Sequence, residues 1–311
     1  MSGKSTWEIW GLNAAMTVEG GHQIQAARAI AEAVLADIEL ACSRFRPDSE
    51  VMKLARSGAE CTAISPTLAL LIEGALQAAR DSDGDVDPLL GGELVNLGYD
   101  RDFAHLPETT IKGVSITQRP LRPILWPHIQ LVGTRLTLPA GTALDLGATA
   151  KAMAADWTAA RVSEELGTAV LVSLGGDIAT AGTAKEPWQV LVRDTDADPW
   201  QQISLQSGFA VATSSTRKRR WSHRGLAMHH ILDPAFGLPA HPVHSSITVA
   251  APTCLAANTY TTAGIVRGTK ALEWLESMNL PARLVSLDGR VQHTSRWPAP
   301  AHDPRSVSAN G

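Results

Sequence analysis

Cysteine is scarce in this chain of 311 residues, which has only Cys42, Cys61 and Cys254. They are far apart and no two of them form a CxxC pair, so a disulfide framework and a cysteine zinc site are both excluded. Unpaired cysteines are typical of a reducing compartment. The first residues contain no apolar run, and we therefore expect no signal peptide, no lipoprotein-type leader and a cytoplasmic location.

Long hydrophobic runs and an excess of basic charge are also missing. No stretch approaches the roughly 18 apolar residues of a transmembrane helix, so we expect no membrane span. The net charge is −4 and the isoelectric point is near 6.2. Nucleic acid is an unsuitable partner for such a chain, because phosphate-binding surfaces need a basic excess. A hydrophobic content of 44% with 19% charged residues is instead typical of a compact protein.

Several familiar catalytic signatures are absent from the sequence. It has no GxSxG elbow, no Walker loop and no GxGxxG after a strand, which argues against hydrolase, kinase and Rossmann functions. No segment repeats at a fixed spacing of about 20–50 residues, so solenoids and propellers are excluded.

Apolar periodicity predicts a mixture of helices and strands. Helices are expected at 24–41, 67–80, 149–166, 254–266 and 270–278, and strands at 114–118, 129–132, 169–174, 189–192 and 246–250. Ser65 and Pro66 supply an N-cap and a first turn for the second helix. The elements do not follow a regular βαβ period, which indicates a mixed α/β or α+β architecture. Residues 298–311, rich in Pro, Ala and Ser, are expected to form a disordered tail.

Two polar, glycine-punctuated segments lie in the first half of the chain. GDVDPLLGGELVNLGYD (84–100) contains Asp85 and Asp87, and its simplest interpretation is a turn-rich loop capped by Asp side chains. In ALDLGATAKAMAADW (143–157), the end of an expected strand meets Asp145 before a helix begins. The free N–H groups of that helix and the charge of Lys151 suit phosphate oxygens. The equal alternative is that Asp145 simply caps the helix.

Two further segments lie in the second half. In LVSLGGDIATAG (171–182) the glycine pair allows a close backbone approach to a ligand or a neighbouring strand, and Asp177 is a turn former. The basic run RKRR (217–220) favours a solvated hairpin tip over a phosphate clamp. The adjacent histidines His229 and His230 do not by themselves indicate a function. Asn258 and Thr262 share one face of an expected helix, and their hard oxygens suit Mg²⁺ shared with a substrate phosphate.

Taken together, these segments resemble the ApbE family, the FAD:protein FMN transferases, from about residue 10 to residue 268. Each motif is weak alone, but their order and spacing make the resemblance specific. The motifs are CSRFRPDSEVMKL (42–54), GDVDPLLGGELVNLGYD (84–100), ALDLGATAKAMAAD (143–156), LVSLGGDIATAG (171–182), PWQVLVRD (187–194), AVATSSTRKRRW (210–221), HHILDPAFGLPA (229–240) and the helix from 258 to 262.

The resemblance implies a fold and an activity. The fold is α+β, with mixed, largely antiparallel sheets flanked by helices in a T-fold-like arrangement, and one FAD-binding domain over 1–297. The activity is the Mg²⁺-dependent transfer of FMN from FAD to a Thr or Ser hydroxyl of a client flavoprotein, with release of AMP. The implied partners are therefore FAD, Mg²⁺ and a client protein.

The resemblance also implies roles for particular residues. His230 would accept a proton from the incoming hydroxyl, and Lys151 would steady the diphosphate. Phe45 is suited to pack on the flavin ring. The Mg²⁺ ligands would be the Ala148 backbone oxygen, Asn258 and Thr262. The flavin-nucleotide contacts would come from Trp10, Phe45, Asp85, Val86, Asp87, Asp145, Lys151 and Ile231.

Some positions depart from the family pattern. Asn258 stands where the family usually has Asp, which removes a negative charge from the metal site. Leu12 stands where the family usually has Thr, which removes a hydroxyl near the flavin. Two alternatives therefore stay open at this point. In one, water attacks FAD and gives FMN and AMP, and in the other the chain binds FAD without turnover.

Overall fold

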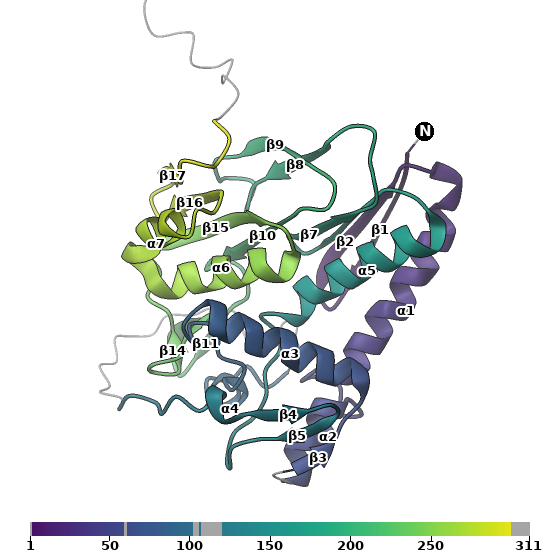
Figure 1. Ribbon diagram of the computed structural model, residues 1–311. Helices are drawn as coiled ribbons and strands as arrows, with labels where there is room; N and C mark the ends of the chain where they lie inside the picture. Colours follow the sequence, from purple (N-terminus) through teal and green to yellow (C-terminus); the bar gives the residue numbers. More distant parts are fainter. Residues whose placement is uncertain (1, 59–60, 102–105, 107–119, 300–311) are drawn as a thin grey trace, which may run out of the picture.

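The computed structural model describes residues 2–58, 61–101, 106 and 120–299 (Figure 1). Its centre is an eight-stranded sheet with the order β1-β2-β6-β7-β10-β15-β16-β17, and each pairing between described strands is antiparallel. The strands are β1 (Gly3–Ile9), β2 (Leu12–Val18), β6 (Val170–Leu174), β7 (Asp177–Ala181), β10 (Ala210–Ser215), β15 (His244–Ala251), β16 (Ala282–Ser286) and β17 (Val291–His293).

Helices cover one face of this sheet. α5 (Ala150–Leu166) packs on β6 and β7, and α6 (Cys254–Arg267) packs on β10 and β15. α1 (Ile24–Cys42) and α3 (Pro66–Asp81) then pack against α5 and α6 (Figure 1). Because α5 is buried mainly through alanines, it lies close to its neighbours on several sides. The α+β class with largely antiparallel strands is confirmed.

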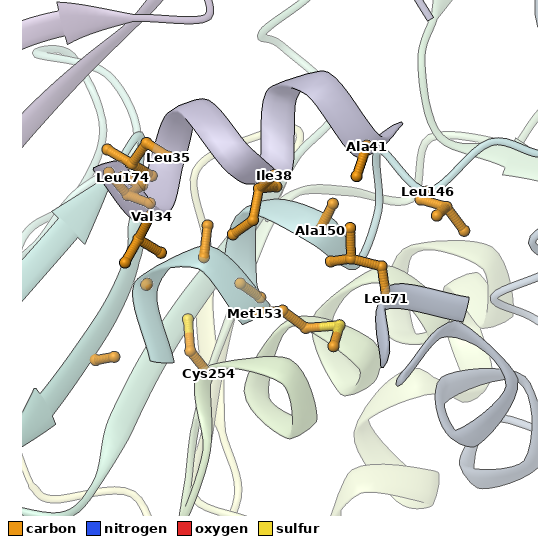
Figure 2. Packing of buried hydrophobic residues seen from close by; sticks show 14 of the residues in the cluster. Val34, Leu35, Ile38, Ala41, Leu71, Leu146, Ala150, Met153, Leu174 and Cys254 are labelled. Atoms are coloured by element: carbon orange, nitrogen blue, oxygen red, sulfur yellow. The ribbon is translucent and has the colours of Figure 1, made fainter. Parts of the chain in front are cut away.

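The hydrophobic core lies between the sheet and these helices. Figure 2 shows Ile38 of α1, Leu71 of α3 and Met153 of α5 in the space between these helices, and Leu174 of β6 beside Leu35 of α1. The buried residues of α1 recur every three or four positions, which is why the sequence pattern identified this helix.

The opposite face of the sheet is covered by a hairpin of β8 (Trp188–Val192) and β9 (Gln201–Leu205). Val190 and Ile203 from the hairpin form a second buried cluster with Val211 of β10 and with Trp297. Ala210 and Ala212, on either side of Val211, belong to the main core. This alternation is the two-residue period of a strand buried on both faces.

The remaining elements are short and surround the helical layer. They are η1 (Gly21–Gln23), α2 (Glu50–Ser57), β3 (Cys61–Ala63), α4 (Gly91–Asn96), η3 (Trp126–His128), β4 (Gln130–Val132), β5 (Arg135–Thr137), β11 (Arg220–His223), β12 (Leu226–His229), β13 (Leu232–Asp233), β14 (Leu238–Pro239), η4 (Gly268–Lys270) and α7 (Ala271–Ser277). In the described ranges, no helix is both long enough and apolar enough to cross a membrane.

The helices predicted from the sequence are all present. The Ser65 hydroxyl caps α3 by accepting a hydrogen bond from the Leu68 backbone N–H at 3.1 Å, as expected. The strands expected near 130, 170, 190 and 246 are also confirmed as β4, β6, β8 and β15. The strand expected at 114–118 lies outside the described residues, and so does most of the expected tail, from 300 onward.

One local prediction was wrong. The chain before Asp145 is not a strand, because β5 ends at Thr137 and the segment up to Asp145 runs as turns and loop. Its backbone is held instead by the loop at 88–91: the Asp145 N–H donates to the Pro88 carbonyl at 2.8 Å, and the Gly91 N–H donates to the Ala143 carbonyl at 3.2 Å. Pro139 and Gly141 in this segment interrupt any strand pattern.

Candidate active site

A cavity of about 1130 Å³ lies where several chain segments meet. Its walls come from the β1–β2 turn, the chain after α1, the loop before α4, the start of α5, the end of β10 and the face of α6. Every site residue predicted from the sequence lines it: Trp10, Phe45, Asp85, Val86, Asp87, Asp145, Ala148, Lys151, His230, Ile231, Asn258 and Thr262. The structure thus brings the whole predicted set together, while the role of each residue stays a prediction.

Two tight hairpin turns form one end of the cavity. Trp10 and Gly11 join β1 to β2 with positive φ angles of 51° and 66°, the pattern of a two-residue hairpin turn. Tryptophan rarely adopts this conformation, and its buried Nε1 has no hydrogen-bond partner within the described ranges. Gly175 and Gly176 form the matching turn between β6 and β7. A Cβ at Gly175 would lie 2.9 Å from the Leu12 side chain, so the expected close approach is to a neighbouring strand.

Asp145 fixes the chain before α5. Its carboxylate pairs with Arg44 Nε at 2.5 Å and accepts the Gly147 N–H at 2.6 Å. The N-cap residue of α5 is Thr149, whose side chain makes no capping hydrogen bond. The alternative that Asp145 simply caps this helix is therefore wrong, because its carboxylate acts one turn earlier and holds Arg44.

Lys151 extends from the first turn of α5 toward Asp177, the first residue of β7. Its Nζ donates to the Gly147 carbonyl at 2.7 Å. Burial and the charge of Arg219 lower the pKa of Lys151, while Asp177 and Asp145 raise it. Asp177 is only 2% exposed, and burial raises its pKa against the opposing effect of Lys151. The sequence pattern identified Asp177 only as a turn former, but it lies at the centre of the site.

Asn258 and Thr262 present oxygens on the same face of α6, as predicted. Thr262 Oγ1 lies 3.4 Å from Asn258 Oδ1 and 3.1 Å from Ser214 Oγ of β10. Asn258 Nδ2 donates to Asp177 Oδ1 at 2.9 Å. Within the described ranges no three His, Cys, Asp or Glu side chains cluster as a metal site. A cation here would therefore depend on neutral oxygens beside the Asp177 carboxylate.

The position of α6 is fixed by an acidic residue of α5. The Asp156 carboxylate accepts the Cys254 N–H at 2.8 Å and the Leu255 N–H at 3.0 Å. These are two of the free N–H groups at the start of α6, and an anion there is favourable. This contact sets the register in which Asn258 faces Asp177.

Asp85 and Asp87 lie in the loop between α3 and α4. The Asp87 carboxylate accepts the Leu89 N–H at 2.8 Å, which confirms the turn-capping interpretation for this residue. Asp85 pairs with Arg267 Nε at 2.5 Å, and so ties the loop to the end of α6. Burial raises the pKa of both carboxyl groups.

Aromatic side chains form another part of the wall. The rings of Phe45 and Tyr99 lie 5.4 Å apart, and Tyr99 stacks on Trp221 at 5.0 Å. Trp221 is fully buried, and its Nε1 donates to the Leu97 carbonyl at 2.7 Å. Phe45, in contrast, is 38% exposed. The exposed part of the Phe45 ring, held by the buried Tyr99 and Trp221, gives a planar ligand an apolar surface to pack on.

The two adjacent histidines have different environments. His229 is buried, and its Nε2 donates to the Ala240 carbonyl at 2.9 Å. His230 lines the cavity, and its buried Nδ1 has no hydrogen-bond partner in the described part of the chain. Burial, helped by the charges of Arg219 and Lys151, lowers the pKa of His230 well below 6.5. The imidazole is therefore neutral near pH 7 and free to accept a proton.

The basic run at 217–220 is not a solvated hairpin tip, contrary to the favoured prediction. All of its residues line the cavity, between the end of β10 and the start of β11. Arg217 pairs with Asp198 at 2.6 Å and Lys218 with Asp194 at 2.9 Å. Asp194 and Asp198 lie in an irregular loop a few residues before β9. The charge pattern of residues 217–220 alone does not predict that these acids lie beside the run.

Sequence reasoning also missed Arg44, which pairs with Asp145 and lies 5.1 Å from the Phe45 ring centroid. It is next to Phe45 in the CSRFRPD motif, so the motif itself was the signal that could have found it. Arg219 and Asp177 likewise lie within family motifs, AVATSSTRKRRW (210–221) and LVSLGGDIATAG (171–182).

Comparison with known sequences identifies relatives along most of the chain. The model of the ApbE family matches residues 8–284. The FAD:protein FMN transferase of Treponema pallidum is 31% identical over 252 residues, covering 74% of this chain and 68% of the relative. The protein of the same name from Salmonella typhimurium is 28% identical over 273 residues, covering 83% of this chain and 75% of the relative.

Solved structures show the same arrangement of elements. The ApbE protein of Thermotoga maritima superposes with a TM-score of 0.78 at 25% identity, covering 95% of this chain and 97% of the other. The apo form of the Pseudomonas stutzeri flavinyl transferase ApbE has the same fold, with a TM-score of 0.78 at 23% identity and 95% coverage of both chains. With the family model matching most of its length and its fold shared by these structures, this chain belongs to the ApbE family.

Proposed function

We propose that this protein is an FAD:protein FMN transferase, which moves FMN from FAD to a Thr or Ser hydroxyl of a client flavoprotein and releases AMP. One observation carries the proposal. In a member of the ApbE family, Lys151, neutral His230 and the oxygen donors of Asn258 and Thr262 all line one cavity large enough for a dinucleotide.

The cavity walls match the parts of FAD. The partly exposed Phe45 ring offers a stacking face for the isoalloxazine. The Trp10 Nε1 donor, buried without a described partner, suits a polar edge of the ligand. Lys151 and the N–H groups at the start of α5 suit the diphosphate.

A magnesium ion fits the oxygens on α6. The donors would be Asn258 Oδ1, Thr262 Oγ1 and the backbone oxygen of Ala148, with the Asp177 carboxylate beside Asn258 as the nearest negative charge. These hard, mostly neutral oxygens are the kind that Mg²⁺ shares with substrate phosphate. When bound, the ion would neutralise negative charge that develops on the diphosphate.

The chain's own residues would perform the remaining steps. The client hydroxyl oxygen attacks the phosphorus on the FMN side, the bond to the bridging oxygen breaks, and AMP leaves with that oxygen. His230 takes the hydroxyl proton, which its lowered pKa permits because the imidazole is already neutral. Lys151 holds the diphosphate in line, so that positioning supplies much of the rate.

The test is a transfer assay read by intact mass. Purified protein is incubated with FAD, Mg²⁺ and candidate client proteins, and each client is examined for a covalent FMN adduct while AMP is quantified. A client adduct formed together with one AMP per transfer supports the proposal. No adduct on any client, with FAD consumed to FMN and AMP, would show hydrolysis instead.

A non-catalytic FAD-binding protein is the second candidate, and the neutral Asn258 in the cation site favours it. Tight FAD binding without AMP release at high Mg²⁺ would identify it in the same assay. A cytoplasmic location stays a prediction, which the unpaired cysteines support.

A further inference from the structure

Arg219 differs from its neighbours in the basic run. Arg217 and Lys218 are paired with Asp198 and Asp194, whereas the described residues offer the Arg219 guanidinium neither a hydrogen bond nor an ion pair. It is nevertheless half-buried in the cavity wall. A guanidinium removed from water without an anionic partner is unfavourable, so this side chain is suited to receive an anion.

The backbone at Arg219 supports a role in binding. Its φ angle is 50°, in the left-handed region that residues with long side chains rarely adopt. Arg219 does not lie in a two-residue hairpin turn, but directly before β11. Arg224, with φ of 51°, lies in the turn that joins β11 to β12 and is exposed. Strain at Arg224 follows from the turn, whereas strain at Arg219 is of the kind that collects at ligand sites.

Charge complementarity indicates which anion would fit. Arg219, Lys151 and His230 all line the cavity, and the charge of Arg219 lowers the pKa of the other two groups, so the two cations Arg219 and Lys151 face a common space. Asp177, a buried carboxylate whose pKa the charge of Arg219 lowers, is already hydrogen bonded to Asn258. With Asp145 balanced by Arg44, the cations Lys151 and Arg219 face Asp177 alone among the described carboxylates, and the excess positive charge would be balanced by a diphosphate with two negative charges. The planar fork of a guanidinium also matches phosphate oxygens in geometry.

We propose that Arg219 binds the diphosphate of FAD together with Lys151 and selects a dinucleotide over riboflavin. This inference rests on the proposed function, because it takes FAD as the ligand of the cavity.

The test measures the affinity of FAD and of riboflavin by flavin fluorescence in EDTA, so that no metal contributes. We expect Arg219→Ala to weaken FAD binding by about 10-fold to 100-fold, the usual range for a lost charge-assisted hydrogen bond. Riboflavin, which has no phosphate, should bind the variant within about twofold of wild type, since it lacks the group that Arg219 contacts. Arg219→Lys should recover part of the loss as a point charge.

Arg224→Ala is the matched control, because it removes an arginine with nearly the same φ from the turn of the neighbouring β11–β12 hairpin, outside the cavity. It should bind FAD like wild type. Arg219→Gly removes the guanidinium and also the strain, so it should melt no lower than wild type while binding FAD weakly. Arg219→Gly therefore reports the FAD affinity without the guanidinium even if Arg219→Ala folds poorly.

Two results would overturn the proposal. If Arg219→Ala and Arg219→Gly bind FAD like wild type, Arg219 does not contact the diphosphate. If the affinities of both variants for FAD and for riboflavin fall equally, Arg219 shapes the cavity and does not bind the phosphate groups. Either result leaves the proposed function intact as long as the wild type binds FAD and transfers FMN. If the wild type binds no FAD, the proposed function and the role of Arg219 are both overturned.

Discussion

Replacing Asn258 by Asp probes the cation site most directly. In the wild type, Asn258 Nδ2 donates to Asp177 Oδ1 at 2.9 Å, and both side chains are buried. Asn258→Asp removes this donor and places a second carboxylate against the first. Without metal the variant should be less stable, and with Mg²⁺ it should bind the ion more tightly than wild type.

The loss of stability in the metal-free variant follows from the contact between residue 258 and Asp177. A hydrogen bond to a charged group contributes about 1.5–3 kcal/mol. Two carboxylates about 4 Å apart repel by roughly 4 kcal/mol at an effective dielectric constant of 20, although protonation of one of them relieves part of this. We expect the metal-free variant to lose about 2–4 kcal/mol of unfolding free energy, or about 4–8 °C in Tm.

The pH dependence has a definite sign. Burial already raises the pKa of Asp177, and a second carboxylate would raise it further. A carboxyl whose pKa is higher in the folded state destabilises the fold above that pKa, and the penalty disappears as the pH falls below the unfolded value. The Tm deficit of the metal-free variant should therefore shrink as the pH is lowered from neutrality toward about 4, the pKa range of a free carboxyl.

Thermal unfolding in EDTA and in Mg²⁺, with calorimetric titration of Mg²⁺, measures these effects. We expect Mg²⁺ to bind the variant at least about 10-fold more tightly and to restore its Tm, because carboxylates are the preferred ligands of this ion. FMN transfer should not fall. Asn258→Ala is the control that removes the hydrogen bond without adding charge. Unchanged Mg²⁺ affinity together with lower transfer would refute the assignment of position 258 as a ligand.

Three further predictions test the site and the fold. His230→Ala should cut FMN transfer by about 100-fold or more with FAD affinity unchanged. Wild-type transfer should persist below pH 6.5, because burial and nearby cations lower the pKa of His230. A midpoint of the pH–rate profile at or above 6.5 would contradict this. Lys151→Met should weaken FAD binding by about 10-fold to 100-fold, measured by flavin fluorescence, and equal affinity would remove Lys151 from the diphosphate site. Gly175→Ala should cost about 1–3 kcal/mol in urea unfolding because φ is 65° and the new Cβ would meet Leu12. Gly208→Ala, with positive φ but open space, should lose less, and equal losses would show that the Leu12 contact is unimportant.

The sequence was most informative where a pattern depends on neighbouring residues. The apolar spacing of α1 and the Ser65–Pro66 start of α3 predicted those helices closely. The segment before Asp145 was predicted wrongly as a strand, because its backbone hydrogen bonds go to a loop far from it in sequence. The β1–β2 hairpin was not predicted, although Trp10 and Gly11 form its turn.

The sequence by itself determined the family, the helices, the close approach at the 175–176 glycine pair and the predicted site residues, all of which line the cavity. These depend on local periodicity, on backbone angles and on the order of motifs, all of which are properties of the chain as written. Only the tertiary structure decided which polar and charged side chains contact one another. Asp177 meets Asn258 across 81 positions, Arg267 meets Asp85 across 182, and Arg219 faces Lys151 without an acid of its own among the described residues. Such contacts follow from how the sheet and helices pack, because burial and distance, and not sequence spacing, set the charge balance of a site.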